Sequence, residues 1–161
     1  MSYDLTQTDA DFFFQMEKFP ENEKSFEYPN SGEKLSLLFT SADKREIFHF
    51  DVLRGSIRIT KITYQSRARK AHVLRRLDLE GPPHINPDVD ILPLSFLEPF
   101  NGKEIPCPHL HIYVEGFGER WAIPANDVID LENKDLYEIM EHFFKYCNVK
   151  QLPKITKTLM L

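Results

Sequence analysis

Cysteine is almost absent from this sequence of 161 residues, which contains only Cys107 and Cys147. Two cysteines are too few for the disulfide framework of a small secreted domain, so we expect a cytoplasmic protein whose thiols are both reduced. The chain also lacks an apolar run of about 18 residues, so no membrane-spanning helix is expected. Its N-terminus lacks the basic start and the apolar stretch of a secretory signal. These absences favour one globular domain, and a chain of this length can bury a sufficient core.

Acidic residues are missing from one long stretch of the chain, although the formal net charge is −5. No Asp or Glu occurs between Val52 and Leu77, whereas the acids concentrate in segments 4–33 and 115–141. The cationic side chains of the same stretch are Arg54, Arg58, Lys61, Arg67, Arg69, Lys70, Arg75 and Arg76. A basic stripe on an acidic protein is typical of a surface that binds a polyanion such as RNA. The alternative is a solvated sheet face whose charges pair with nearby acids.

Hydrophobic periodicity predicts an α+β fold, in which an antiparallel meander sheet of about five or six strands carries a helix from each end of the chain. Within a single domain, we assign 1–32 to an N-terminal helix and loop and 33–124 to the sheet. We assign 125–147 to a C-terminal helix and 148–161 to a tail. The segment 80–106 is rich in proline and is predicted as one long loop, a feature that is often functional in a compact domain.

Period-two alternation and short connections place the strands more closely. The predicted strands are 33–39, 46–52, 57–64, 71–79, 108–114 and 120–124. A turn is expected at 65–68 between two of them. The C-terminal helix is predicted over 133–146, because its apolar residues recur at helical spacing.

Three of the six histidines lie in two clusters flanked by proline. His84 follows two prolines in the segment 81–88, and His109 and His111 follow Pro108. Imidazole is the side chain whose unperturbed pKa lies nearest neutrality, so it can donate a proton, accept one or bind a metal. Residues two apart on a strand share a face, so His109 and His111 should point the same way. We expect the proline-rich loop to fold back and bring His84 to them.

These histidines suggest cleavage of RNA without a metal or other cofactor. One imidazole would take a proton from the attacking hydroxyl, and another would protonate the leaving oxygen. The catalytic residues of this reaction would be His84, His109 and His111. The side chains predicted to hold the phosphate backbone are Arg58, Arg67, Arg69 and Lys70. Those predicted to stack on bases are Tyr64 and Tyr113.

Two other interpretations of the histidines stay open. If the strand continues regularly, Glu115 shares a face with His109 and His111, and this spacing is half of a cupin metal motif. The protein would then be a cupin-like metal-dependent enzyme. Alternatively, His84 and His109 have structural roles and close the proline-rich loop by hydrogen bonds to backbone carbonyls. Cys107 is expected to be buried in the strand rather than to act as a nucleophile.

Two segments of the chain resemble an uncharacterised family of small bacterial and phage proteins. They are 81–88, with the pattern GPPH-x-NPD, and 109–121, with the pattern HLHIY-x-EG-x-G-x-x-W. The resemblance extends over about 33–153 and implies a bacterial or mobile-element origin, but it implies no activity. The Pro-His-x-His strand is also similar to that of small toxins from toxin–antitoxin pairs.

Composition, motifs and resemblance together favour a toxin-like protein that acts on RNA, with an antitoxin as its protein partner. The alternative is a non-enzymatic inhibitor from a phage or mobile element that binds a host defence nuclease of the CRISPR type. Its acidic segments, 4–33 and 135–141, would then contact the nuclease by charge complementarity. Neither alternative requires a membrane partner.

Overall fold

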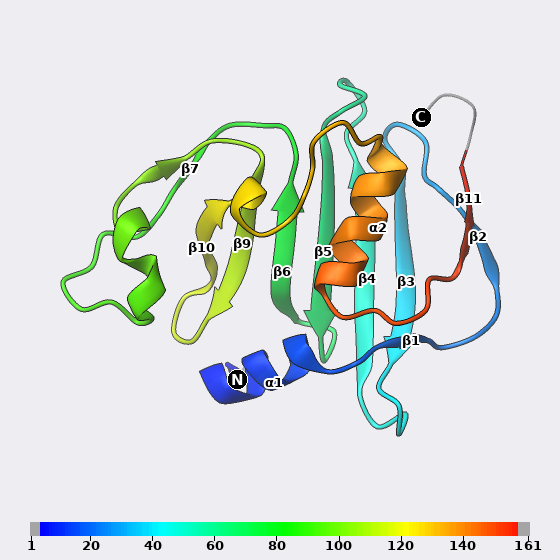
Figure 1. Cartoon of the computed structure of the whole chain (residues 1–161), viewed down its shortest axis with the longest axis horizontal. Coiled ribbons are helices and arrows are strands. Elements are labelled where there is room, and N and C mark those ends of the chain that lie inside the picture. Colours follow the sequence, from blue (N-terminus) through cyan, green and yellow to red (C-terminus); the bar gives the residue numbers. More distant parts are fainter. Residues whose placement is uncertain (1–3, 158–161) are drawn as a thin grey trace.

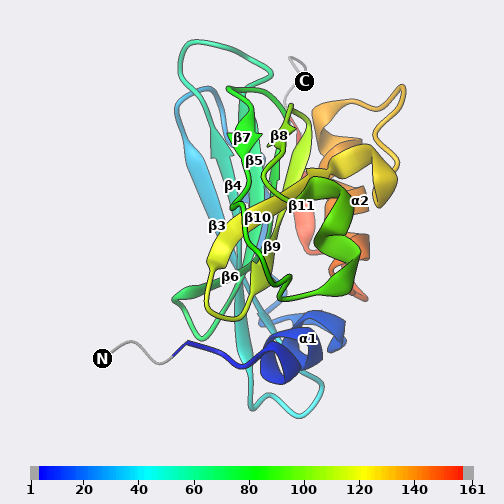
Figure 2. The same cartoon turned by 90° about the vertical axis from the view of Figure 1, so that its left-hand side faces the viewer.

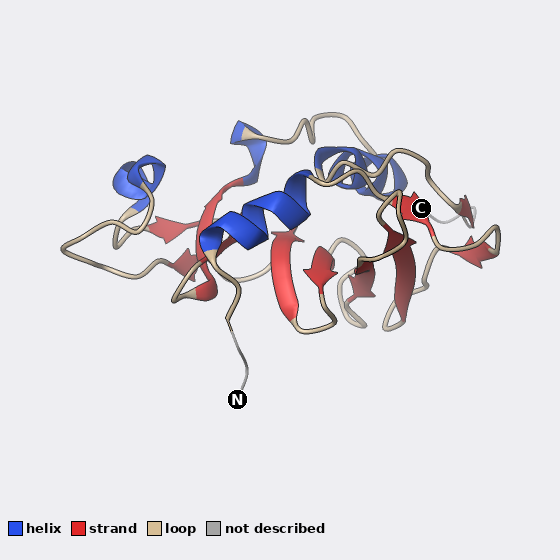
Figure 3. Ribbon diagram, turned by 90° about the horizontal axis from the view of Figure 1, so that it is seen from below, coloured by secondary structure: helices blue, strands red, loops and turns tan. Residues whose placement is uncertain are grey.

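The computed structural model describes residues 4–157, and it has a mixed α/β architecture built on one large antiparallel sheet (Figure 1). In spatial order, the seven strands of this sheet are β1 (Phe19–Pro20), β3 (Lys34–Thr40), β4 (Ile47–Arg54), β5 (Ile62–Ala68), β6 (His72–Asp78), β9 (His109–Val114) and β10 (Gly118–Pro124). Helices α1 (Gln7–Gln15) and α2 (Leu136–Tyr146) lie on the same side of the sheet (Figure 3). The predicted helices and antiparallel sheet are confirmed in outline, with more strands than expected.

Helix α2 covers the middle of the sheet because one of its faces is apolar (Figure 1). A capping box starts the helix: the Asp135 side chain accepts from the Glu138 N–H, and the Glu138 side chain accepts from the Asp135 N–H. The Phe144 ring then packs 5.8 Å from that of Phe39 and 5.0 Å from that of Phe50. These edge-to-face contacts join the helix to β3 and β4 in the core. Within the described chain, the opposite face of the sheet is free of helices (Figure 3).

The two helices are joined through a buried ammonium group. Lys18, which follows α1, is fully buried, and its Nζ donates to the carbonyls of Phe14, Met16 and Cys147 at 2.8–2.9 Å. An ammonium has three N–H donors, so these three acceptors satisfy it completely. The Phe48 ring centroid also lies 4.8 Å from Nζ. The end of α2 is thereby tied to the exit of α1, a link that the sequence pattern does not indicate.

The predicted strand over 57–64 is wrong in its first half. β5 starts later, and Ile57 and Ile59 are 95% and 64% exposed in the connection from β4. The chain makes a wide turn there, closed by a hydrogen bond from the Gly55 N–H to the Lys61 carbonyl at 2.7 Å. The alternation of the two isoleucines therefore does not mark a buried face.

The predicted turn at 65–68 is also wrong, because these residues continue β5. The chain reverses instead at Arg69 and Lys70, whose φ angles are 49° and 65°. This left-handed conformation is uncommon for residues other than glycine and marks a tight turn. The pairing of β5 with β6 also shifts between Ser66 and Arg67, which lie opposite Arg75 and Val73, so β6 contributes one extra residue at this point.

The segment 80–106, predicted as one loop, contains three short elements and covers an edge of the sheet (Figure 2). They are β7 (His84–Ile85), the 3-10 helix η1 (Ser95–Phe100) and β8 (Glu104–Ile105), and β7 pairs with β8. Asn86 caps the edge strand β10. Its side-chain amide accepts from the Ala122 N–H and donates to the Ala122 carbonyl, both at 2.8 Å. One side chain thus pairs with main-chain groups that an edge strand would otherwise leave free.

The predicted N-terminal loop and the predicted tail both contain a strand. β2 (Ser25–Glu27) and β11 (Lys154–Thr156) pair in parallel, and they lie beyond β3, far from β10 (Figure 1). A second short 3-10 helix, η2 (Ala125–Asp127), follows β10 directly. Residues 158–161 of the predicted tail lie outside the described residues.

Both cysteines are free thiols, as predicted. Cys147 is fully buried at the end of α2, and burial raises the pKa of its thiol to about 11, so it stays protonated at neutral pH. Over the part of the chain that the structure describes, no helix is both long and apolar enough to cross a membrane.

Candidate functional site

The register between β6 and β9 brings polar side chains together. In this antiparallel pair Asp78 lies opposite His109, and Arg76 lies opposite His111. Residues that face each other across two strands project from the same side of the sheet. The intervening residue of each strand is a leucine that is fully buried in the core. The polar side chains therefore project from the side away from α2.

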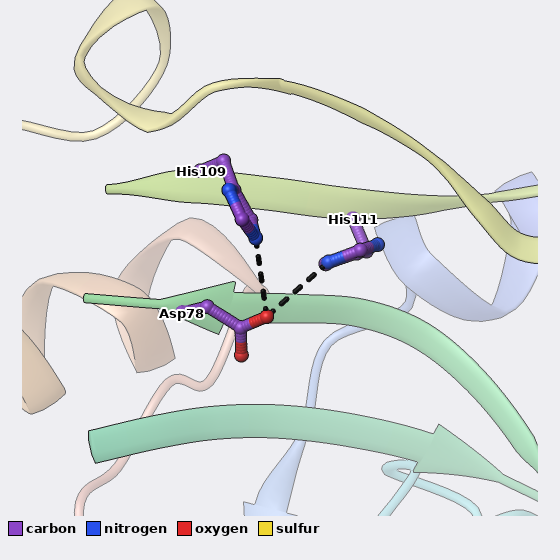
Figure 4. A group of neighbouring side chains, drawn as sticks. All are labelled: Asp78, His109 and His111. Carbon is purple, nitrogen blue, oxygen red and sulfur yellow. Dashed lines mark hydrogen bonds and ion pairs between the residues drawn. The ribbon is translucent and has the colours of Figure 1, made fainter. Parts of the chain in front are cut away.

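Asp78, His109 and His111 form a compact cluster on this side (Figure 4). Oδ2 of Asp78 lies 3.2 Å from Nε2 of His109 and 3.2 Å from Nε2 of His111. Each of the three residues offers one nitrogen or oxygen atom that could bind a metal, and these three atoms all lie within 4.8 Å of one another. Both imidazoles are buried. The predicted sharing of one face by the two histidines is correct.

Main-chain carbonyls fix the orientation of both imidazoles. Nδ1 of His109 lies 3.0 Å from the Ile105 carbonyl oxygen, and Nδ1 of His111 lies 2.8 Å from that of Glu119. A carbonyl only accepts hydrogen bonds, so Nδ1 must carry the hydrogen in each ring. This arrangement directs Nε2 of both rings to Asp78. The structural role predicted for His109 is therefore real, and it coexists with the convergence of the rings.

His84 joins the two histidines from β7. Its ring centroid lies 4.6 Å from that of His111 and 6.0 Å from that of His109. Its Nε2 donates to the Arg120 carbonyl at 2.7 Å, so Nδ1 is left as the acceptor. Partial burial lowers the pKa of His84, so the imidazole is neutral at pH 7. The proline-rich segment folds back as the sequence predicts.

Asp78 is an ionised carboxylate held by its neighbours. Burial alone would raise the pKa of Asp78, but hydrogen bonds with His109 and His111 and the charge of Arg76 hold it well below its usual range. Thr63 adds a hydrogen bond to Oδ1 at 2.8 Å. Asp78 is not among the site residues predicted from the sequence. The one feature of the sequence that points to Asp78 is its position as the first acidic residue after the basic stretch.

Arg76 is the arginine that the fold brings to the cluster. Its Nη2 donates to Oδ2 of Asp78 at 3.1 Å and lies 3.0 Å from Nε2 of His111. Its Nη1 donates to Oε1 of Glu119 on β10 at 2.6 Å. The guanidinium therefore bridges the cluster and a second carboxylate.

A polar cavity of about 380 Å³ opens beside the cluster. Its walls come from β4, β5, β6, β9 and the proline-rich segment. Besides the cluster and Arg76, its lining includes Leu53, Lys61, Thr63, Gln65, Glu80, Pro82, Pro83, His84 and Cys107. Cys107 is half-buried before β9 rather than buried within the strand, which corrects the prediction. Burial raises the pKa of its thiol, so this group stays protonated.

The basic residues predicted to hold RNA do not line this cavity. Arg67 lies on the same face of the sheet but is paired with Asp51 at 2.7 Å. Arg58 pairs with Glu80, which does line the cavity, at 2.8 Å. The remaining predicted contacts, Arg69 and Lys70, lie in the turn at the other end of β6. The alternative expectation, that these charges pair with nearby acids, describes Arg58, Arg67 and also Arg69, which lies 3.5 Å from Glu46.

The two tyrosines predicted to stack on bases are buried in the protein. The Tyr64 hydroxyl shares a 2.6 Å hydrogen bond with that of Tyr28 on the core side of the sheet. The Tyr113 hydroxyl donates to the Leu5 carbonyl at 2.8 Å. Period-two alternation indicates which side chains share a face with each tyrosine. It does not indicate whether the rest of the chain covers that face. Neither ring can stack on a base in this structure.

Glu115 does not join the two histidines. It follows β9, where its Oε2 accepts from the Gln7 N–H at 3.0 Å. The carboxylate near the imidazoles is Asp78 of the neighbouring strand. In the predicted set of metal ligands, Asp78 therefore takes the place of Glu115. A residue on a neighbouring strand is brought close by the register of the sheet, which spacing along one strand does not reveal. The sheet order also ends at β1 and β10 without closing into a cupin barrel.

The chain matches a family profile described as "Family of unknown function (DUF6978)" over residues 5–149. The match includes α1, which lies before the region that the sequence resemblance covers. Neither a curated protein nor a solved structure matches the chain.

Proposed function

The chain belongs to DUF6978, a family of unknown function, and we propose that it is a hydrolase of phosphodiester bonds. The observation that supports this is the convergence of three imidazoles and one carboxylate at a single polar cavity. Groups of this kind exchange protons with a reacting bond at neutral pH. RNA is the substrate class that the basic stretch of the sequence favours.

His84 is the residue that we assign to proton exchange with the substrate. Unlike His109 and His111, it is only half-buried, and it lies on the lining of the cavity. Its Nε2–H is held by the Arg120 carbonyl, so Nδ1 is the nitrogen available to a hydroxyl or a water. His109 and His111 direct their Nε2 atoms at the same carboxylate oxygen, so they are poorly placed to act on opposite sides of a phosphate.

Arg76 and Lys61 are assigned to the phosphate oxygens. Both line the cavity, and a cation near the phosphorus stabilises the charge that develops during cleavage. They replace the predicted contacts from Arg58, Arg67, Arg69 and Lys70. The volume of about 380 Å³ suits one nucleotide unit rather than a long segment of RNA.

The test is hydrolysis by the full chain of bis(p-nitrophenyl) phosphate and of a labelled single-stranded RNA. His84→Gln should lower the rate by about 100-fold or more, the usual range for loss of a general acid or base. His142→Gln, on α2 outside the cavity, is the matched control and should keep the wild-type rate. Circular dichroism of each variant reports the fold. A wild-type chain inactive on both substrates, or equal rates for the two variants, would overturn the proposal.

A further inference from the structure

We infer that the cavity binds a divalent transition-metal ion through Nε2 of His109, Nε2 of His111 and Oδ2 of Asp78. The inference about binding stands on the geometry of these three residues. The catalytic use of the ion rests on the hydrolysis proposed above.

The distances between the three donor atoms suit one shared ion. Nitrogen and oxygen ligands of zinc lie about 2.0–2.2 Å from the metal, so two ligands of a tetrahedral site lie about 3.3 Å apart. The two measured separations from Asp78 Oδ2, one to His109 and one to His111, are both 3.2 Å. Two imidazoles and one carboxylate favour Zn²⁺ or Fe²⁺ over Mg²⁺ or Ca²⁺, which prefer oxygen ligands.

The main-chain contacts prepare both imidazoles for a metal. In known sites a metal-bound histidine donates its second ring N–H to a carbonyl or a carboxylate, which fixes the tautomer and the ring. His109 donates to the Ile105 carbonyl, and His111 donates to the Glu119 carbonyl. Nε2 of each ring is thereby directed at Oδ2 of Asp78.

A cationic side chain already lies beside two of these three atoms. Nη2 of Arg76 lies 3.1 Å from Asp78 Oδ2 and 3.0 Å from His111 Nε2. Glu119 holds the other arm of the guanidinium at 2.6 Å. An ion at the cluster would displace Nη2 while Glu119 retained the arginine.

The ion would keep a coordination position open towards the cavity. The core and the strands enclose the cluster from the other side, since both histidines are buried. A three-ligand protein site with an open position is typical of catalytic rather than structural zinc. The ion would lower the pKa of a water bound there, and the His84 ring lies 4.6 Å from that of the proposed ligand His111.

The experiment measures binding directly. The full chain is stripped with a chelator, dialysed and titrated with Zn²⁺ by calorimetry, and Co²⁺ is added in a parallel sample to record its visible spectrum. We expect one ion per chain and a Co²⁺ spectrum of low coordination number without a thiolate charge-transfer band. Asp78→Asn and His111→Gln should each weaken binding by at least about 100-fold, while His142→Gln leaves it unchanged.

The outcomes separate this inference from the proposed function. No Zn²⁺ binding by the unmodified chain, or equal affinity in Asp78→Asn, would overturn the metal site. Hydrolysis by the stripped chain would then leave the proposed function intact. Conversely, binding without hydrolysis would support the metal site and remove the proposed activity. The Co²⁺ spectrum needs no substitution, so a variant that fails to fold does not prevent a decision.

Discussion

Arg76 donates a hydrogen bond from Nη2 to Oδ2 of Asp78 at 3.1 Å, two residues along the same strand. The same carboxylate oxygen is the one that faces both imidazoles. A guanidinium and a metal ion therefore compete for one atom. This competition makes the affinity of the site dependent on a residue that is not a ligand.

The first prediction concerns this competition. Arg76→Gln removes a positive charge and a competing donor, so Zn²⁺ affinity should rise by about tenfold, equivalent to about 1.4 kcal/mol. Glu119→Gln removes the carboxylate that would retain the guanidinium once an ion displaced it from Asp78, so affinity should fall by a similar factor. Calorimetric titration of the stripped chains measures both. Changes of the same sign in the two variants, or no change in either, would contradict the competition.

The second prediction concerns Lys18. Lys18→Met leaves three main-chain carbonyls without a donor, one of them buried and two partly buried, so the free energy of unfolding should fall by about 2–4 kcal/mol. Urea denaturation followed by circular dichroism gives this value. Lys24→Met, at an exposed lysine, is the control and should change stability little. Equal stability of the two variants would show that the ammonium does not join α1 to α2.

The third prediction is a pH dependence carried by Asp51. Burial would raise the pKa of Asp51, but hydrogen bonds from Arg67, Ser36 and Gln65 hold it below its usual value. The native state thus binds this proton more weakly than the unfolded state, whose pKa is about 3.9. The stabilisation is complete above that pKa and is lost as the pH falls through the lower, native value.

Asp51→Asn should therefore lower the free energy of unfolding by about 2 kcal/mol at pH 7, and the difference from wild type should shrink below about pH 4. Urea denaturation at pH 7 and at pH 2 measures this difference in the free energy of unfolding. Asp90→Asn, at an exposed position, serves as the reference. A difference that stayed constant between pH 7 and pH 2 would contradict the assignment to ionised Asp51.

The fourth prediction concerns the cap on β10. Asn86→Ala leaves the N–H and the carbonyl of Ala122 without partners, so stability should fall by about 1–3 kcal/mol. Hydrogen exchange in the β10 segment should also become faster. Mass spectrometry of peptides from this strand measures the exchange. Asn126→Ala, an exposed asparagine just after β10, should leave the rate as in wild type; a similar acceleration there would argue against a specific cap.

The two signature segments acquire physical reasons from the fold. In GPPH-x-NPD, His84 and Asn86 are two residues apart, and both bond main-chain groups of β10. In the second segment, Gly116 and Gly118 take φ angles of 83° and 61° in the turn between β9 and β10. Trp121 is fully buried at its end. The first segment covers an edge, and the second forms the hairpin that carries two of the histidines.

Local patterns were reliable where neighbouring residues decide the outcome. The face shared by His109 and His111 follows from period two, and the helix over 136–146 follows from its apolar spacing. Prediction was unreliable where a segment with alternating apolar residues has no neighbouring strand to pair with. Ile57 and Ile59 alternate like a strand, yet they are exposed because the chain turns at Gly55 before the sheet resumes.

The sequence by itself determined which residue types carry the chemistry, because the histidines and their neighbouring prolines are identified by their positions along the chain alone. It also determined the helices and most strands, because these depend on contacts within a few residues. Only the tertiary structure decided that Asp78 and Arg76, rather than Glu115 and the predicted arginines, accompany the histidines. The physical reason is that strand register, set by the packing of the whole core, places side chains from distant parts of the chain opposite one another.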